Sequence, residues 1–149
     1  MKKIYLIIFI FLGSYAFGDK SNDPYFYIDS DKLIITDNPT TSEFIGNAYA
    51  RNSESHFWGD KILVNYDDNK EIELITIIRN VRIKRANEEI TGDKAIYNLK
   101  LENINITSNV SITKNGDVLN GDELIIDLIT SSSIIKGNNS NQVSAKIIK

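Results

Sequence analysis

A fourfold internal repeat is the feature of this sequence that most restricts its fold. A Gly-Asp or Ser-Asp step followed by an apolar run occurs four times, with its aspartate at Asp31, Asp60, Asp93 and Asp122. The intervals between these aspartates are 29, 33 and 29 residues. A second landmark lies twelve residues before each of the three Gly-Asp glycines, at Asn47, Asn80 and Asn109. Two landmarks in constant spacing indicate one small structural unit repeated along the chain.

Within each unit, apolar and polar side chains alternate with a period of two. Val81 and Ile83 flank Arg82, and the next unit repeats this pattern with Val110, Ser111 and Ile112. This period is typical of β-strands with one buried face. No window sustains a helical period with capping residues, and Ile, Val, Thr, Tyr and Asn dominate. The pattern therefore predicts an all-β chain.

Turn-forming residues separate the alternating runs. They occur at 67–69, 87–89 and 115–117, and we also expect turns at the Gly-Asp steps themselves. Each unit would then contain two or three short strands. Glycine-aspartate repeats can also bind calcium, but one carboxylate per unit of about 30 residues falls short of the six to eight oxygen ligands that calcium takes. We therefore favour the turn role and expect no metal site.

Catalytic chemistry finds no support in the sequence. No acidic pair stands in a distinctive context for glycoside hydrolysis, and the only histidine, His56, has no recognisable triad or zinc partner. The chain also has no cysteine, which excludes thiol catalysis and cysteine metal sites. We expect a protein that is not an enzyme and needs no cofactor.

The first eighteen residues have the pattern of a secretory signal peptide. Lys2 and Lys3 precede an apolar run over residues 4–12, and small residues at 16 and 18 provide a cleavage site. An uncleaved anchor is the alternative, but the run is half the length of a membrane span. We expect residues 1–18 to be removed and residues 19–149 to form one domain, with a loose polar segment at 137–142.

Cleavage would leave fifteen basic residues against twenty acidic ones, so a nucleic-acid partner is not expected. The one basic cluster includes Arg82, Lys84 and Arg85, which could contact phosphate groups or form a solvated face. Phe57 and Trp58 should face opposite sides of a strand. For Trp58 we favour core packing over a role as a lipid-facing anchor.

The ordered recurrence of these motifs resembles a known family. Ile28-Asp29-Ser30-Asp31, then Gly46-Asn47-Ala48, then Gly-Asp-Lys before an apolar strand are similar to the OstA-like, or LptA, proteins of lipopolysaccharide transport. The resemblance covers about residues 27–137. It implies a twisted β-jellyroll of two facing antiparallel sheets, whose apolar interior shields the acyl chains of lipopolysaccharide and performs no reaction.

The alternation itself defines the side chains that should face such an interior. Two apolar sheet faces can close on each other or hold lipid tails between them. Counting outward from the landmarks, we predict ten inward, lipid-contacting residues: Ile62, Val64, Val81, Ile83, Ala95, Tyr97, Val110, Ile112, Leu124 and Ile126. The opposite strand register would turn their neighbours inward instead.

The sequence therefore predicts a periplasmic carrier that moves lipopolysaccharide from the inner to the outer membrane. The resemblance implies as partners lipopolysaccharide, an LptC-like inner-membrane protein, an LptD-like outer-membrane protein and further copies of the chain, stacked head to tail. Two alternatives stay open. One is a membrane-anchored, LptC-like partner of the same pathway, and the other is a structural or adhesive β-repeat protein with a dry core.

Overall fold

The computed structural model describes residues 27–51 and 55–148, and every regular element in these two ranges is a β-strand. The predicted signal peptide, residues 1–18, lies outside the described residues. The strands are β1 (Tyr27–Asp29), β2 (Lys32–Asp37), β3 (Thr40–Arg51), β4 (Ser55–Tyr66), β5 (Ile72–Arg85), β6 (Glu88–Asn98), β7 (Asn103–Lys114), β8 (Asp117–Asp127), β9 (Ser132–Lys136) and β10 (Ser144–Lys146). The all-β prediction is confirmed.

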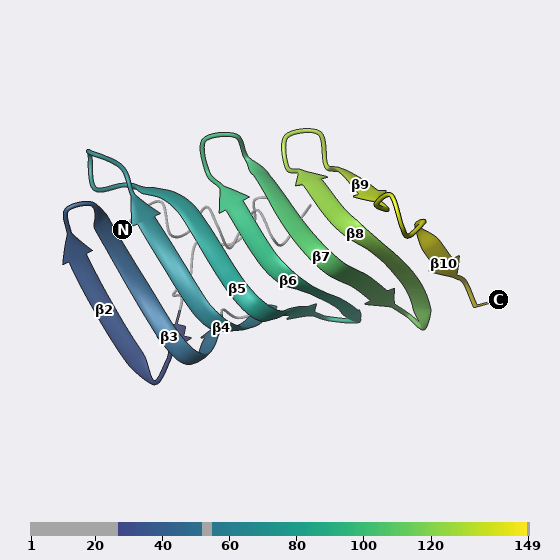
Figure 1. Ribbon diagram of the computed structural model, residues 1–149, viewed down its shortest axis with the longest axis horizontal. Helices are drawn as coiled ribbons and strands as arrows, with labels where there is room; N and C mark the ends of the chain where they lie inside the picture. The colour runs from purple at the N-terminus through teal and green to yellow at the C-terminus, as the bar shows by residue number, and fades with distance from the viewer. Residues whose placement is uncertain (1–26, 52–54, 149) are drawn as a thin grey trace, which may run out of the picture.

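The strands form one antiparallel sheet in the order β1-β3-β4-β5-β6-β7-β8-β10. At one edge β1 and β2 pair with the two halves of β3, and at the other edge β9 and β10 pair with the two halves of β8. Figure 1 shows the consequence, a row of long strands that curve and twist together. Only neighbours in sequence pair in the middle of the sheet, from β3 to β8.

Short loops explain why sequence neighbours become sheet neighbours. Asn115 and Gly116 both have positive φ, at 53° and 90°, and join β7 to β8 as the two-residue turn that suits the twist of a hairpin. Between β4 and β5, the carboxylate of Asp67 accepts hydrogen bonds from the backbone N–H groups of Asn69 and Glu71, at 2.9 and 3.0 Å. The turn predicted at 67–69 therefore lies between strands, whereas those predicted at 87–89 and 115–117 extend into the starts of β6 and β8, with only Asn87, Asn115 and Gly116 between strands.

The Gly-Asp steps do not lie between strands, so the prediction of turns there was wrong. Each lies in the middle of a long strand, where the pairing register shifts as at a β-bulge. Strands β3, β5 and β7 carry two consecutive residues of positive φ at the same level: Gly46-Asn47, Arg79-Asn80 and Ser108-Asn109. Bulges bend strands. Strands of 11 to 14 residues thus bend in their middle, in place of two or three short strands per unit.

The two sequence landmarks meet at these bulges in a contact that we call the Asp–Asn clasp. The side-chain amide of each asparagine donates to an aspartate earlier in the chain, which lies between β1 and β2 for Asp31 and on the preceding strand for the other two: Asn47 to Asp31 at 2.8 Å, Asn80 to Asp60 at 3.0 Å and Asn109 to Asp93 at 2.8 Å. Asparagine tolerates the positive φ that the bulge requires, and a carboxylate acceptor strengthens a hydrogen bond. The repeat therefore encodes a row of bends.

The glycines of the Gly-Asp steps make room for an isoleucine of the next strand. A Cβ added at Gly59 would lie 2.4 Å from Ile77 Cγ2, and one at Gly92 would lie 2.7 Å from Ile106 Cγ2. Real Cβ atoms essentially never approach so closely. A close approach between neighbouring strands at the bend thus requires glycine at these positions.

Gly59→Ala should therefore destabilise the fold by about 1–3 kcal/mol through overpacking. Ile77→Ala removes the methyl group that the new Cβ would meet. In chemical denaturation, the double variant should lose less stability than the two single variants lose together, because they share one contact. Additive losses would contradict the proposed packing of Ile77 over Gly59.

Both halves of each bent strand bury their apolar side chains on the same inner side. On β5, Ile77 before the bend and Val81 and Ile83 beyond it are all buried, because a two-residue bulge preserves the alternation of faces. The core cluster draws on β3 to β8 along both halves. The two facing sheets implied by the family resemblance are thus the two halves of one bent sheet.

Candidate functional site

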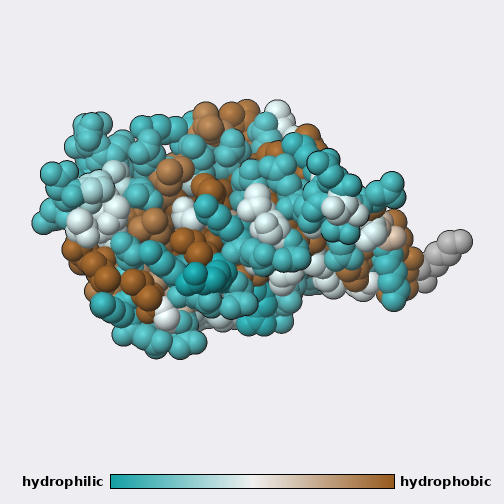
Figure 2. Space-filling model, in the orientation of Figure 1, coloured by the Kyte–Doolittle hydropathy of each residue, from teal (hydrophilic) through white to brown (hydrophobic). Residues whose placement is uncertain are grey.

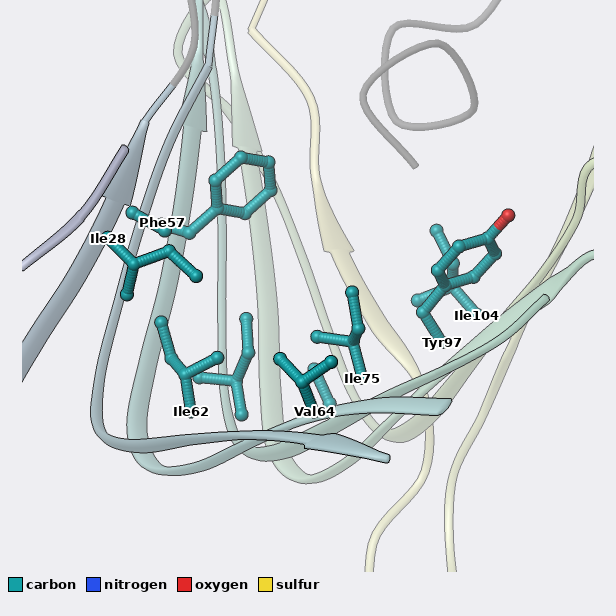
Figure 3. A pocket seen from close by; sticks show the side chains of 10 residues that line it. Ile28, Phe57, Ile62, Val64, Ile75, Tyr97 and Ile104 are labelled. Carbon is teal, nitrogen blue, oxygen red and sulfur yellow. The ribbon is translucent and has the colours of Figure 1, made fainter. Parts of the chain in front are cut away.

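An apolar pocket lies inside the bend of the sheet, towards its N-terminal end. The space that it borders measures about 480 Å³ and is continuous with open solvent on one side, so only part of it is enclosed. The lining comes from both halves of the bent sheet, as Figure 3 shows for Phe57 facing Ile62 and Val64. The lining residues are Ile28, Ala50, Phe57, Ile62, Val64, Ile75, Ile77, Ala95, Tyr97 and Ile104. We call this region the trough.

Hydrocarbon dominates the trough. Tyr97 is the only lining residue whose side chain carries a polar atom, and Figure 3 shows its ring beside Ile104. Burial raises the pKa of the Tyr97 phenol, and the negative charge of Glu102 raises it further. The phenol therefore stays neutral at ordinary pH, and the lining presents no charge. Such a surface can hold apolar groups but offers no acid, base or nucleophile for catalysis.

This raised pKa predicts how stability depends on pH. A free tyrosine ionises near pH 10, whereas folded Tyr97 keeps its proton to higher pH. Above about pH 10 the unfolded chain releases this proton and the folded chain does not, so stability falls as pH rises. Urea unfolding at about pH 8 and pH 11 should show a smaller loss for Tyr97→Phe than for the wild type. Equal losses would mean that Tyr97 titrates normally.

The ten residues predicted to face inward all lie on the inner side of the sheet. Ile112 and Ile126 are partly buried and pack against the core, and the other eight are buried. Four of the ten line the trough: Ile62, Val64, Ala95 and Tyr97. Val81, Ile83, Val110 and Leu124 belong to the core cluster but not to the trough lining. Their contact with lipid stays a prediction.

Six trough residues were not among those ten: Ile28, Ala50, Phe57, Ile75, Ile77 and Ile104. The alternation could have identified some of them, because Ile75 and Ile77 continue the phase of Val81 and Ile83 across the two-residue bulge. Phe57 precedes a one-residue bulge at Asp60. This bulge shifts the alternation of inward and outward side chains by one residue between Gly59 and Ile62. Its inward direction therefore depends on the bulge itself, which the sequence pattern did not reveal.

Trp58 lies on the outer face, so the prediction of core packing for it was wrong. Phe57 is only 3% exposed and lines the trough, which leaves Trp58 on the opposite side of the strand. There its ring packs beside Tyr49 and His56, with centroids 5.3 and 5.6 Å away, and the Arg82 guanidinium lies 3.9 Å above it. A hydrogen bond of 2.6 Å joins Tyr49 Oη and His56 Nδ1. His56 thus contributes to outer-face packing.

The predicted phosphate contacts also lie away from the trough. Arg82 and Lys84 are exposed, whereas the residues that alternate with them, Val81 and Ile83, are buried on the inner side. Arg85, at the end of β5, is partly buried and stands opposite Glu88 on β6. A phosphate bound by Arg82 and Lys84 would lie on the outer face of the sheet. These contacts therefore need a different ligand position from that of an acyl chain in the trough.

No group of three or more acidic or histidine side chains within 27–51 and 55–148 is placed to hold a metal ion. Three of the repeated aspartates instead accept hydrogen bonds in the clasps. The described part of the chain also contains no helix long and apolar enough to span a membrane. The trough is thus the candidate site that the described residues support.

Comparisons with known proteins identify the family of this chain. The family model described as "LptA/(LptD N-terminal domain) LPS transport protein" matches residues 27–132, which is more than half of the chain. The chain belongs to this family. Proteins of the LptA/LptD N-terminal family are transport proteins, so the expectation of a protein without enzymatic activity is confirmed.

A solved structure shows the same fold. It is LptH from Pseudomonas aeruginosa, described as the LptA homologous periplasmic component of the conserved lipopolysaccharide transport device. The two superpose with a TM-score of 0.70 at 10% sequence identity, over 84% of this chain and 96% of that one. No curated protein matches the chain. The jellyroll fold implied by the sequence resemblance is therefore confirmed.

Proposed function

We propose that this chain carries lipopolysaccharide through the periplasm, with acyl chains held in the trough. The observation that carries the proposal is the lining, in which nine of ten side chains are hydrocarbon and the tenth is a neutral phenol. The family model supports the pathway, lipopolysaccharide transport. The periplasmic location is supported by the signal-peptide pattern of residues 1–18 and by the periplasmic LptH, whose fold the chain shares.

The physical driving force is hydrophobic burial. Removing one methylene group from water contributes about 0.8 kcal/mol, so a few buried methylenes already give measurable affinity. Because hydrophobic burial has no directional requirement, the same lining accepts acyl chains at successive positions. The trough can therefore hold lipid and still let it move along, with the energy for directed transport supplied by other proteins.

Native mass spectrometry of the purified chain with lipopolysaccharide tests this proposal against a dry structural core. We expect a mass increase that corresponds to bound lipopolysaccharide and that disappears when a detergent with alkyl chains competes for the trough. A chain that stays lipid-free at all lipopolysaccharide concentrations would instead favour the structural or adhesive repeat protein.

The membrane-anchored, LptC-like alternative makes a different prediction for the N-terminus. A carrier that moves within the periplasm should lose residues 1–18, whereas an anchored partner should keep them. Mass measurement of the exported chain separates the two, because only the anchored form would contain Met1. We propose the cleaved form, since the apolar run is too short for a membrane span.

We also propose that copies of the chain stack end to end between an LptC-like and an LptD-like partner. At the N-terminal edge, β3 is the only strand among residues 27–51 and 55–148 that pairs with β2. The β2 side chains Leu33 and Ile35 are 49% and 68% exposed, and Figure 2 shows hydrophobic groups over this edge, on the left. An edge strand with free backbone groups is a template for another strand. Edge pairing would align the troughs of neighbouring copies.

A further inference from the structure

The fourth repeat contains both halves of a clasp, but in the structure they are apart. Asp122 and Asn138 are sixteen residues apart, the same separation as in the clasps of Asp31 with Asn47 and of Asp93 with Asn109. Asn138 also follows a glycine, as Asn47 does. In the structure its Oδ1 instead accepts hydrogen bonds from the backbone N–H groups of Ser140 and Asn141, at 2.7 and 2.8 Å.

Asp122 lacks the partner that the other three aspartates have. Its Oδ2 atom is buried and has no hydrogen-bond partner among the described residues. A buried polar atom without a hydrogen-bond partner destabilises the fold, because it has lost its hydrogen bonds to water. The Asp122 side chain is therefore placed for an amide donor that the structure does not supply.

The fourth repeat has the same structure as the other three as far as Lys136. Ile135 packs over Gly121, as Ile77 packs over Gly59 and Ile106 over Gly92, and Glu123 pairs with Lys136 just as Lys94 pairs with Thr107. The departure begins at Gly137, which does not adopt the positive φ of Gly46. The carbonyl oxygen of Asn141 instead packs directly against Gly137.

The departure amounts to four extra residues. On β6, the residues on either side of the bulge, Thr91 and Lys94, pair with Ser111 and Thr107, which are four residues apart. On β8, the equivalent residues Asn120 and Glu123 pair with Ser144 and Lys136, which are eight residues apart. Residues 137–143 therefore form a loop in place of a bulge. We call this arrangement the looped register.

We propose that the C-terminal segment also adopts a clasped register, in which Asn138 donates to Asp122 and Ser140 replaces Ser144 opposite Asn120. A shift by four residues keeps every side chain on its own face. The clasped register gains the hydrogen bond to the buried Asp122 oxygen. It loses the three residue pairs of β10, whose residues are all exposed in the looped register.

The sequence explains why the looped register is the one in the structure. The looped register places Val143 and Ala145 at the positions that Val110 and Ile112 occupy on β7, whereas the clasped register places Asn139 and Asn141 there. Val143 is 42% exposed and Ala145 is exposed as well, so these apolar side chains favour the looped register only slightly. The unpartnered carboxylate oxygen of Asp122 favours the clasped register, so the two effects oppose each other.

Exchange between the looped and the clasped register changes the C-terminal edge of the sheet. In the looped register the regular part of this edge ends with β9, five residues long, because the loop follows it directly. In the clasped register one bent strand would run from Ser132 to about residue 142, as β7 does. A longer unbroken edge pairs better with an added strand. This consequence for stacking rests on the proposed function, whereas the register exchange itself does not.

Cysteine pairs test the exchange directly, because the chain has no cysteine of its own. Directly opposed residues of antiparallel strands lie within disulfide distance. Asn120→Cys with Ser144→Cys reports the looped register, and Asn120→Cys with Ser140→Cys reports the clasped one. In a glutathione redox buffer we expect both pairs to form a disulfide. A 120–140 pair that stays reduced while the 120–144 pair oxidises would overturn the proposal.

Asn138→Asp is the matched control for the clasp. Aspartate keeps the oxygen that accepts from Ser140 and Asn141 in the loop, but it cannot donate to Asp122 and repels it. We expect this substitution to reduce the 120–140 disulfide by about tenfold or more and to leave the 120–144 disulfide intact. An unchanged 120–140 yield would show a freely moving tail and no clasp.

The assembly consequence has its own readout. Native mass spectra of the two disulfide-locked forms, at equal concentration and without lipid, should show larger oligomers for the 120–140 form. Equal oligomer sizes would reject the effect on stacking, whereas the disulfide yields alone decide the register exchange. Failure of lipid binding affects neither measurement.

Discussion

Replacing Ile106 by aspartate is expected to leave the chain largely unfolded in water at neutral pH. Ile106 has no exposed surface, belongs to the core cluster, and packs over Gly92 at the bend. A carboxylate there would have neither water nor a positive partner. Burying an uncompensated charge costs about 4 kcal/mol or more, a large part of the 5–15 kcal/mol by which a typical domain is stable.

Urea unfolding followed by the fluorescence of Trp58 measures this effect, because Trp58 is the only tryptophan. Ile106→Leu is the matched control and should change stability by less than about 1.5 kcal/mol, since it keeps volume and polarity. A folded, cooperative Ile106→Asp variant would show that water reaches Ile106, which contradicts a packed inner face at the bend.

Filling the trough is expected to abolish most lipid binding without unfolding the chain. Ile75 lines the trough and is only partly buried, so a tryptophan at this position can extend into the empty space. Displacing two methylene groups of a bound acyl chain already lowers the affinity by about tenfold. We therefore expect Ile75→Trp to bind labelled lipopolysaccharide at least about ten times more weakly than the wild type does.

Thr113→Trp is the control for this substitution. Thr113 is exposed near the end of β7, so a tryptophan there adds the same ring outside the trough. It should bind lipopolysaccharide as the wild type does. Urea unfolding of both variants confirms that they are folded. If Ile75→Trp binds lipid with unchanged affinity while remaining folded, acyl chains do not occupy the trough and the proposed site is wrong.

Much of the fold follows from local patterns in the sequence. The period of two assigns Val81, Ile83 and Val110 to the inner face because adjacent side chains of a strand point to opposite sides. The turn at Asn115-Gly116 follows from the conformational freedom of these two residues at positive φ. The constant spacing of aspartate and asparagine also revealed the repeat. Each of these signals depends on residues that are close together in the chain.

The bends themselves required the tertiary structure. A Gly-Asp step has the composition of a turn, and only the partner strand shows that the glycine admits an isoleucine and that the aspartate binds an asparagine sixteen or twenty residues away. The same contacts decide that Phe57 enters the trough and Trp58 stays outside, because a one-residue bulge changes the phase of β4.

Local alternation thus determined that this protein is a sheet with one apolar face, and which side chains belong to most of that face. Whether that face closes into a dry core or bends around a trough depends on how the strands pair at each bulge. Pairing is a property of two strands together, and a pattern read along a single strand contains no information about the shift between them. The tertiary structure alone decided the shape of the candidate site.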